Sequence, residues 1–314
     1  MTTVDTQLSS SLDCPLQENG ERSIQRIASR PAEVGGIPIH RLMPSRQRRM
    51  IGAWCFLDHA GPATFDPGAG MRVGPHPHIG LQTFTWMIKG EVLHRDSLGN
   101  EQIIRPGQVN LMTAGRGIAH TEESLPSEDT LHATQLWIAL PPQDSHCAPA
   151  FDHHPDLPQW TEHGCHLTLL AGSYGGHEAP AKLYSPLVGV DLDSPDGGSL
   201  TLPLNPEFEY GVLTLEGQAT INSQQFSVDE LAYLGRGNSE LNLQLTPSSR
   251  AILLGGLPCQ DEVLIWWNFV GHSKADIALA QHEWETGSER FGPIHGYDGP
   301  PLTAPPLPPG WAIK

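Results

Sequence analysis

Four residues in the first half of the chain combine metal-binding side chains with a spacing of two. His76 and His78 lie in the segment GPHPHIG, and His120 and Glu122 lie in the segment GRGIAHTEE. On a β-strand, residues i and i+2 point to the same face, so each pair would present its side chains together. Imidazoles with one carboxylate suit Fe(II), Mn, Ni, Cu or Zn. Four such ligands on an octahedral ion would leave two positions open for water, O2 or a chelating substrate.

Each pair taken alone could instead be an exposed strand or a hydrogen-bonded core pair. The chain has 16 histidines among 314 residues, so roughly one His-x-His pair is expected from composition alone. The two pairs together, each introduced by a glycine or proline turn within a strand-like segment, favour a metal site.

The segments around these residues have the pattern of short strands separated by turns. LQTFTWMIKGE alternates large and polar residues, EVLHRDSLGNEQIIRPG reads as two strands about a Gly-Asn turn, and LHATQLWIAL is an apolar strand. The second half of the chain repeats this style, which is typical of an antiparallel sandwich or small barrel. The pattern becomes helical only from CQDEVLIWWNFVGHSKADIALAQHEWETG onward, and the Pro-rich tail GPPLTAPPLPPGW follows.

We therefore predict an all-β chain of two similar domains. The predicted divisions are a polar tail at 1–20, a metal-binding barrel at 21–145, a linker at 146–165, and a second barrel with the helix and tail at 166–314.

Composition argues against several classes of function. A formal net charge of −17 disfavours broad nucleic-acid binding, which needs clustered Lys and Arg. No segment approaches a run of about 18 apolar residues, so we expect no membrane span. The N-terminal segment lacks the basic and apolar regions of a signal peptide, and we expect a cytoplasmic location. The five cysteines show no C-x-x-C spacing and are expected to be free thiols.

The run GPHPHIGLQTFTWMIKGEVLHRDSLGNEQIIRPGQVNLMTAGRGIAHTEE resembles the core of the pirin family, within the cupin superfamily. The similarity extends to FLDHAGPATF before it and to LHATQLWIALP, IWWNFVG and RFGPIHGYDGP after it. The resemblance implies two jelly-roll β-barrels packed face to face, with one metal, usually iron, in the N-terminal barrel. The family's metal motif maps here onto His76, His78, His120 and Glu122.

The chain departs from the general cupin motif at one position. That motif has a glutamate four residues after its second histidine, where this chain has Gln82. In pirins the carboxylate ligand comes from the second motif, so Glu122 still completes the set. We expect Gln82 to line a substrate pocket as a neutral hydrogen-bonding group.

Other residues near the motifs have weaker signals. Phe84 and Met112 are expected to form barrel core or pocket wall, and Arg116 could meet a substrate anion or hold its bend. His59 and His94 are expected to be structural groups or to support the metal ligands. The second barrel is predicted to be metal-free, because the sequence has no histidine between its positions 177 and 272.

The resemblance implies two classes of function. One is a dioxygenase that cleaves flavonols such as quercetin with O2, using Fe(II) and Glu122 as the general base for the flavonol's 3-hydroxyl proton. The alternative is a non-enzymatic, iron-dependent and redox-responsive regulator that binds a protein partner. We favour the enzyme and expect a monomer without direct contact to nucleic acid.

Overall fold

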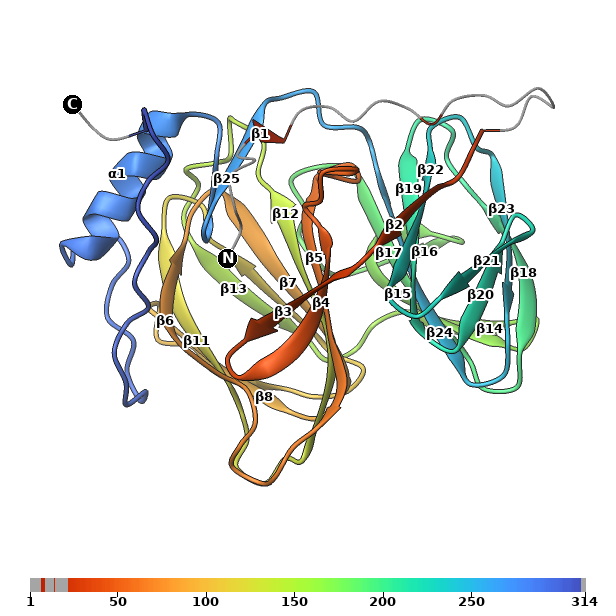
Figure 1. The fold of residues 1–314 in the computed structure, drawn as a ribbon, viewed down its shortest axis with the longest axis horizontal. Helices are drawn as coiled ribbons and strands as arrows, with labels where there is room; N and C mark the ends of the chain where they lie inside the picture. The colour runs from red at the N-terminus through yellow and green to blue at the C-terminus, as the bar shows by residue number, and fades with distance from the viewer. Residues whose placement is uncertain (1–6, 9–13, 15–21, 312–314) are drawn as a thin grey trace.

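The chain folds into two β-barrels, and the one helix among its described residues lies at the outer end of the first barrel (Figure 1). This computed structural model describes residues 7–8, 14 and 22–311. It confirms the predicted all-β fold with a short C-terminal helical segment. In the part of the chain described, no helix has the length and apolar character needed to cross a membrane.

The first barrel consists of a seven-stranded and a four-stranded antiparallel sheet. The larger sheet has the order β13-β10-β7-β12-β5-β4-β3, and the smaller has the order β6-β11-β8-β9. The strands of the larger sheet are Ala150–His154 (β13), Val109–Thr113 (β10), Leu81–Lys89 (β7), Thr130–Ala139 (β12), Trp54–Thr64 (β5), Ile37–Met43 (β4) and Arg30–Val34 (β3). Those of the smaller sheet are Arg72–His78 (β6), Ile118–Ser124 (β11), Val92–Asp96 (β8) and Glu101–Ile104 (β9).

The second barrel repeats this plan with an apolar interior. Its larger sheet has the order β14-β15-β17-β24-β19-β22-β2, with β16 beside β15, and its smaller sheet has the order β18-β23-β20-β21. The strands of the larger sheet are Gln159–Glu162 (β14), Cys165–Tyr174 (β15), His177–Glu178 (β16), Leu187–Ser194 (β17), Ser249–Gly256 (β24), Glu209–Glu216 (β19), Glu230–Gly235 (β22) and Gln25–Ala28 (β2). Those of the smaller sheet are Gly198–Pro203 (β18), Glu240–Leu245 (β23), Gln218–Ile221 (β20) and Gln224–Ser227 (β21). Leucine, valine and isoleucine side chains dominate the interior, where a metal site would need polar ligands.

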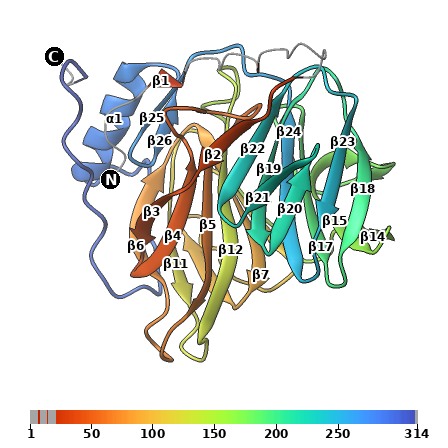
Figure 2. The same cartoon turned by 45° about the vertical axis from the view of Figure 1, so that its right-hand side comes forward.

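Chain segments cross between the barrels in both directions. β2 precedes the first barrel in the sequence but pairs with β22 of the second, a path that Figure 2 shows from the side. Within the predicted linker, β13 pairs with β10 of the first barrel, and β14 pairs with β15 of the second. The larger sheet of each barrel thus includes a strand from outside the predicted range of that barrel, and the predicted domain boundaries stay a prediction.

The C-terminal segment returns to the first barrel. β25 (Val263–Trp266) and β26 (Phe269–Gly271) form a hairpin, and β1 (Gln7–Leu8) pairs with β25. A glycine is required where this hairpin meets the β6–β7 turn. Gly80 has a φ of +66°, and a Cβ there would lie 2.1 Å from the Val270 carbonyl oxygen. The helix α1 (Lys274–Glu285) follows, with the Ser273 hydroxyl accepting a hydrogen bond from the Asp276 backbone N–H as its N-cap.

The two barrels share an apolar core between their larger sheets. Trp54, Phe84 and Leu136 of the first barrel pack with Leu187 and Ile252 of the second. Burying this many large side chains away from water is the main stabilising term at such an interface. The second barrel thus serves as a solid apolar support for the first.

Polar contacts cross the same interface. The His59 Nδ1 lies 2.7 Å from an Asp229 carboxylate oxygen, and its Nε2 lies 2.8 Å from the Nε2 of His132. The His132 Nδ1 lies 3.2 Å from a Glu216 carboxylate oxygen. His59 therefore acts as a structural group between the barrels and lies outside the predicted metal cluster.

Asp191 is a buried carboxylate at this interface. It accepts a hydrogen bond from the Trp86 indole N–H at 3.1 Å and lies 3.3 Å from Arg250. Burial raises the pKa of Asp191 from its ordinary 3.8 to about 6, against the opposing effect of Arg250. A group whose pKa is higher in the folded state contributes stability at low pH, and that contribution is lost as the pH rises through the folded pKa.

We expect this carboxylate to produce a measurable dependence of stability on pH. Its contribution to the free energy of unfolding should fall by roughly 3 kcal/mol as the pH rises from about 3 to about 7. In urea unfolding, Asp191→Asn should lack this part of the dependence of the free energy of unfolding on pH, because the amide is neutral at every pH. Asp193→Asn, which removes a more accessible partner of the same arginine, is the control and should keep most of the wild-type slope, because Asp193 is only a lesser cause of the raised pKa of Asp191. Equal slopes for wild type and Asp191→Asn would contradict the assignment.

Candidate metal centre

Two neighbouring strands bring three of the predicted ligands together inside the first barrel. β6 and β11 are antiparallel, with His76 directly opposite His120. His78 shares the face of His76 because the side chains of a strand alternate. The ring centroids lie 4.2 to 5.0 Å apart, and one nitrogen from each ring lies within 4.8 Å of the others. All three side chains are buried.

Two of these imidazoles have their tautomer fixed by a backbone carbonyl. The Nδ1 of His76 lies 2.9 Å from the Gly74 oxygen, and the Nδ1 of His78 lies 2.9 Å from the Asn268 oxygen. Because a carbonyl only accepts, each Nδ1 must carry the hydrogen and each Nε2 keeps its lone pair. Burial lowers the pKa of His76 to about 4 and that of His78 well below its usual range.

The donor nitrogens converge as metal ligands do. The Nε2 of His78 lies 3.1 Å from the Nε2 of His120, and burial lowers the pKa of His120 well below its usual range. Two nitrogens that each sit about 2.0–2.1 Å from one ion are separated by about this distance. Neutral, buried and converging imidazoles therefore fit a first-row divalent ion.

Glu122 lies beside the cluster but its carboxylate is not one of the grouped donors. On β11 it follows His120 by two residues, with a bulge opposite β6 between them, so Glu122 pairs with Val73. Burial raises the pKa of Glu122 to about 7. Among the described residues, no hydrogen bond or ion pair holds this carboxylate. Its role as a ligand or as a base therefore stays a prediction.

The next residue faces the other side of the strand. Glu123 accepts hydrogen bonds from Arg72 at 3.2 Å and from Arg95 at 2.8 Å. Alternation thus separates two adjacent glutamates, one with arginine partners outside the barrel and one beside the histidines.

Two of the residues expected in a substrate pocket face away from the histidines. The Gln82 amide donates to the Thr113 hydroxyl and to the Lys182 carbonyl, and Phe84 packs in the core shared by the two barrels. Met112 packs with Trp137 and Ile118 in a core cluster of the first barrel. The side chain of Arg116 is exposed, while its carbonyl accepts a hydrogen bond from Arg290.

Three further rings lie next to the histidines, and two of them, Trp137 and Phe151, were not assigned to the site from the sequence. The Trp137 indole contacts the His78 ring edge-on at 5.2 Å and stacks on Phe56 at 4.0 Å. His94 stacks on Phe151 at 4.3 Å, and its Nδ1 lies 3.3 Å from the Nδ1 of His120. The sequence analysis named His94 as a structural group or a support for the metal ligands, and the structure places it beside His120. Trp137 and Phe151 follow only from the pairing of distant strands.

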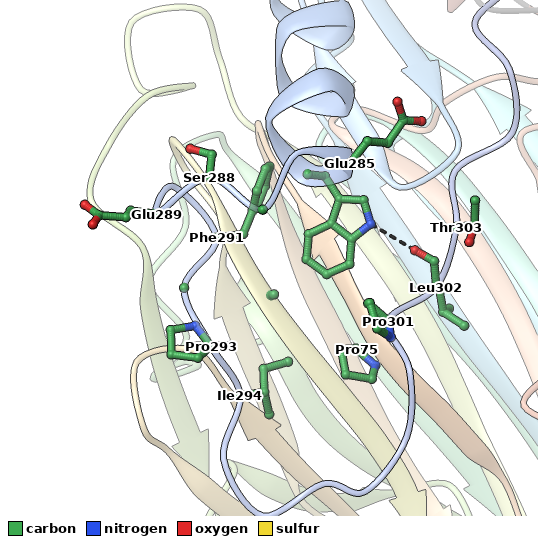
Figure 3. A pocket seen from close by; sticks show the side chains of 14 residues that line it. Pro75, Glu285, Ser288, Glu289, Phe291, Pro293, Ile294, Pro301, Leu302 and Thr303 are labelled. Carbon is green, nitrogen blue, oxygen red and sulfur yellow. Dashed lines mark hydrogen bonds between the residues drawn. The ribbon is translucent and has the colours of Figure 1, made fainter.

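A cavity of about 610 Å³ lies behind the same two strands, on their opposite face. Pro75 and Ala119 line it, and they alternate with His76 and His120 along β6 and β11. Figure 3 shows the cavity between the end of α1 and the C-terminal segment, with Phe291 and Ile294 in its wall. It is therefore separated from the metal cluster by the sheet itself.

Comparison of the sequence with protein families and known proteins gives consistent matches. The family described as Pirin matches residues 36–138, and the Pirin C-terminal cupin domain matches residues 189–292. The chain is 64% identical over 307 residues to a Pseudomonas aeruginosa protein, PA1205, whose name provisionally assigns it as a quercetin 2,3-dioxygenase; the match covers 98% of this chain and 96% of that protein. It is 35% identical to a pirin-like protein of Caulobacter vibrioides, over 85% of this chain and 95% of that protein.

A solved structure agrees with the sequence matches. The crystal structure of quercetin 2,3-dioxygenase from Acinetobacter baumannii is similar, with a TM-score of 0.90 and 49% identity, over 91% of this chain and 96% of that chain. Both cupin domains, the overall fold and the histidine cluster in the first barrel lead to one conclusion. This chain belongs to the pirin family.

Proposed function

We propose that this protein is a metal-dependent dioxygenase that cleaves flavonols such as quercetin with O2. The observation that carries the proposal is the convergence of three neutral, buried imidazoles, His76, His78 and His120, in the first barrel. The close relatives named for quercetin 2,3-dioxygenase activity support the choice of reaction.

The three histidines would hold the ion, and Glu122 would join them or act from beside them. A bound Fe(II), or Mn, Ni, Cu or Zn in its place, would supply Lewis acidity and, for the redox metals, one-electron chemistry toward O2. The histidines are neutral near pH 7, so they can bind a cation without first losing a proton.

Glu122 is suited to move a proton at the substrate. A flavonol has a 3-hydroxyl beside its 4-carbonyl, and removing the hydroxyl proton makes the ring electron-rich toward O2. A pKa of about 7 places this carboxylate near the pH at which a general base works best. Without a salt-bridge partner among the described residues, its oxygens stay available to accept that proton.

Aromatic side chains beside the histidines suit a flat aromatic substrate. Trp137 contacts His78, Phe56 stacks on Trp137, and Phe151 lies beyond His94. Such rings offer stacking surfaces and limit the access of water. A cytoplasmic location, a monomeric state and a possible protein partner stay predictions.

The metal centre predicts a definite stoichiometry. Purified protein should bind one first-row metal per chain by elemental analysis, and His76→Ala or His120→Ala should each remove most of it. His153→Ala is a suitable control, because His153 is hydrogen-bonded to Asn110 and lies outside the cluster. Two metals per chain, or full retention in both alanine variants, would show that the cluster is not the site.

Adjacent glutamates allow a matched test of the base. Glu122→Gln keeps an oxygen donor of similar size but removes the charge, so metal binding should weaken yet remain measurable. Turnover per bound metal should fall by about a hundredfold or more, as for a lost general base. Glu123→Gln, on the outer face, should leave turnover nearly unchanged. Wild-type turnover in Glu122→Gln would make this carboxylate structural only.

The choice of substrate predicts a difference between a flavonol and the matching flavone. The flavone lacks the 3-hydroxyl, so it has one oxygen donor fewer and no proton there for Glu122 to take. Loss of the quercetin absorbance band should require both metal and O2, and the flavone should neither react nor compete well.

Metal-stripped protein and anaerobic samples are the controls for this assay. Equal bleaching by stripped protein would indicate ordinary autoxidation. Absence of bleaching with metal-replete protein would favour the alternative of a regulator that binds a protein partner.

A further inference from the structure

A buried carboxylate on β8, the strand beside β11, is fixed as a hydrogen-bond acceptor. Asp96 lies at the end of β8 and is almost fully buried. Its oxygens accept from the backbone N–H groups of Leu98 and Asn100 and from the Asn100 side chain, at 2.9 to 3.1 Å. Burial alone would raise the pKa of Asp96, but the hydrogen bonds from His94 and Asn100 outweigh it and lower the pKa.

This acceptor determines which nitrogen of His94 carries hydrogen. The Nε2 of His94 lies 3.1 Å from Asp96 Oδ2, and a carboxylate can only accept there. In a neutral imidazole the hydrogen is therefore on Nε2, and Nδ1 keeps a lone pair. That Nδ1 lies 3.3 Å from the Nδ1 of His120.

The relay offers an acceptor that favours one tautomer of His120. The lone pair on His94 Nδ1 can accept a hydrogen from the Nδ1 of His120. The Nε2 of His78 is a competing acceptor on the other side of the ring, 3.1 Å from His120 Nε2, and a cation bound by both Nε2 atoms would remove that competition. Backbone carbonyls perform the same task for His76 and His78, whereas His120 depends on side chains.

We propose that Asp96 and His94 form a positioning relay that holds His120 in the tautomer with a free Nε2, aimed at the metal position. The proposal rests on the metal centre put forward above and adds two residues that do not touch the metal. Hydrogen-bond partners of ligating histidines generally fix ring orientation and raise ligand basicity.

The surrounding structure holds the relay in place. β8 pairs with β11 so that Asp96 is opposite His120 and His94 is opposite Glu122. The His94 ring stacks on Phe151 with an interplanar angle of 12°. Strand register fixes one end of the side chain and ring stacking fixes the other, which leaves His94 little rotational freedom.

Nitrogen NMR of histidine-labelled protein reads the tautomers directly. In Zn(II)-loaded, diamagnetic protein at about pH 8, His94 should show a protonated Nε2 and an unprotonated Nδ1, and His120 should show a protonated Nδ1. In metal-free protein His94 should keep the same tautomer, because Asp96 accepts its Nε2 hydrogen without a metal. A proton on Nδ1 of His94 in either form of the protein would overturn the relay.

Metal affinity tests the role of the relay with two variants of nearly equal shape. His94→Leu removes the acceptor, while His94→Asn keeps an oxygen close to the position of Nδ1. Both lose the stacking on Phe151, so the pair differs mainly in the acceptor. In competition with a chelator, His94→Leu should bind Zn(II) about 10- to 100-fold more weakly than wild type. His94→Asn should remain within about threefold of wild type.

Equal affinities for the two variants would overturn the proposal, whether both match wild type or both are weakened. Circular dichroism and urea unfolding confirm that both variants are folded, and the ratio of their affinities cancels any shared loss of stability. If the two variants differ in Zn(II) affinity but the wild type does not turn over a flavonol, the relay is supported and only the proposed reaction is wrong. If the wild type binds no Zn(II), the proposed metal centre is wrong. The His94 tautomer in metal-free protein then tests the hydrogen bond to Asp96 by itself.

Discussion

Three imidazoles can bind one cation only if all three turn an unprotonated nitrogen toward the same point. Each ring then needs an acceptor for its other nitrogen, because a buried N–H without a partner is costly. The acceptors of His76 and His78 are the Gly74 and Asn268 carbonyls, and His120 faces His94. The first lies two residues from its histidine and the second lies 190 residues away. The cluster therefore depends on contacts between residues that are separated by more than half of the chain.

The need for an acceptor at each imidazole explains why a segment from the end of the chain packs against the first barrel. The hairpin of β25 and β26 returns from the end of the second barrel and delivers the Asn268 carbonyl to His78. It can approach closely because Gly80 has no side chain at the β6–β7 turn. The second barrel packs an apolar core against the first and contains no grouped metal ligands among its described residues. We infer that it supports a site for which it supplies no ligand.

The sequence predicts those parts of the site that depend on local periodicity. His76, His78 and His120 were identified because residues two apart face the same side of any strand. The same rule places the adjacent residues Glu122 and Glu123 on opposite faces. The sheet topology and the position of Asn268 were beyond this kind of reasoning, since a backbone carbonyl carries no residue signature. Gln82 was expected near the substrate, yet β7 turns it toward the second barrel. Which face of a strand points inward depends on its partner strands, and distant pairing decides that.

Two carboxylates on β8 and β11 show how one interior can hold acids in opposite states. Asp96 receives hydrogen bonds from several N–H groups, and its pKa is lowered despite burial. Glu122 has no such partner among the described residues, and burial raises its pKa to about 7. Environments that separate the pKa values of two carboxylates in this way usually give them different roles. One carboxylate keeps its charge, and the other is able to exchange a proton. Asp96 is thus suited to hold His94 in a fixed orientation, and Glu122 to act on a substrate.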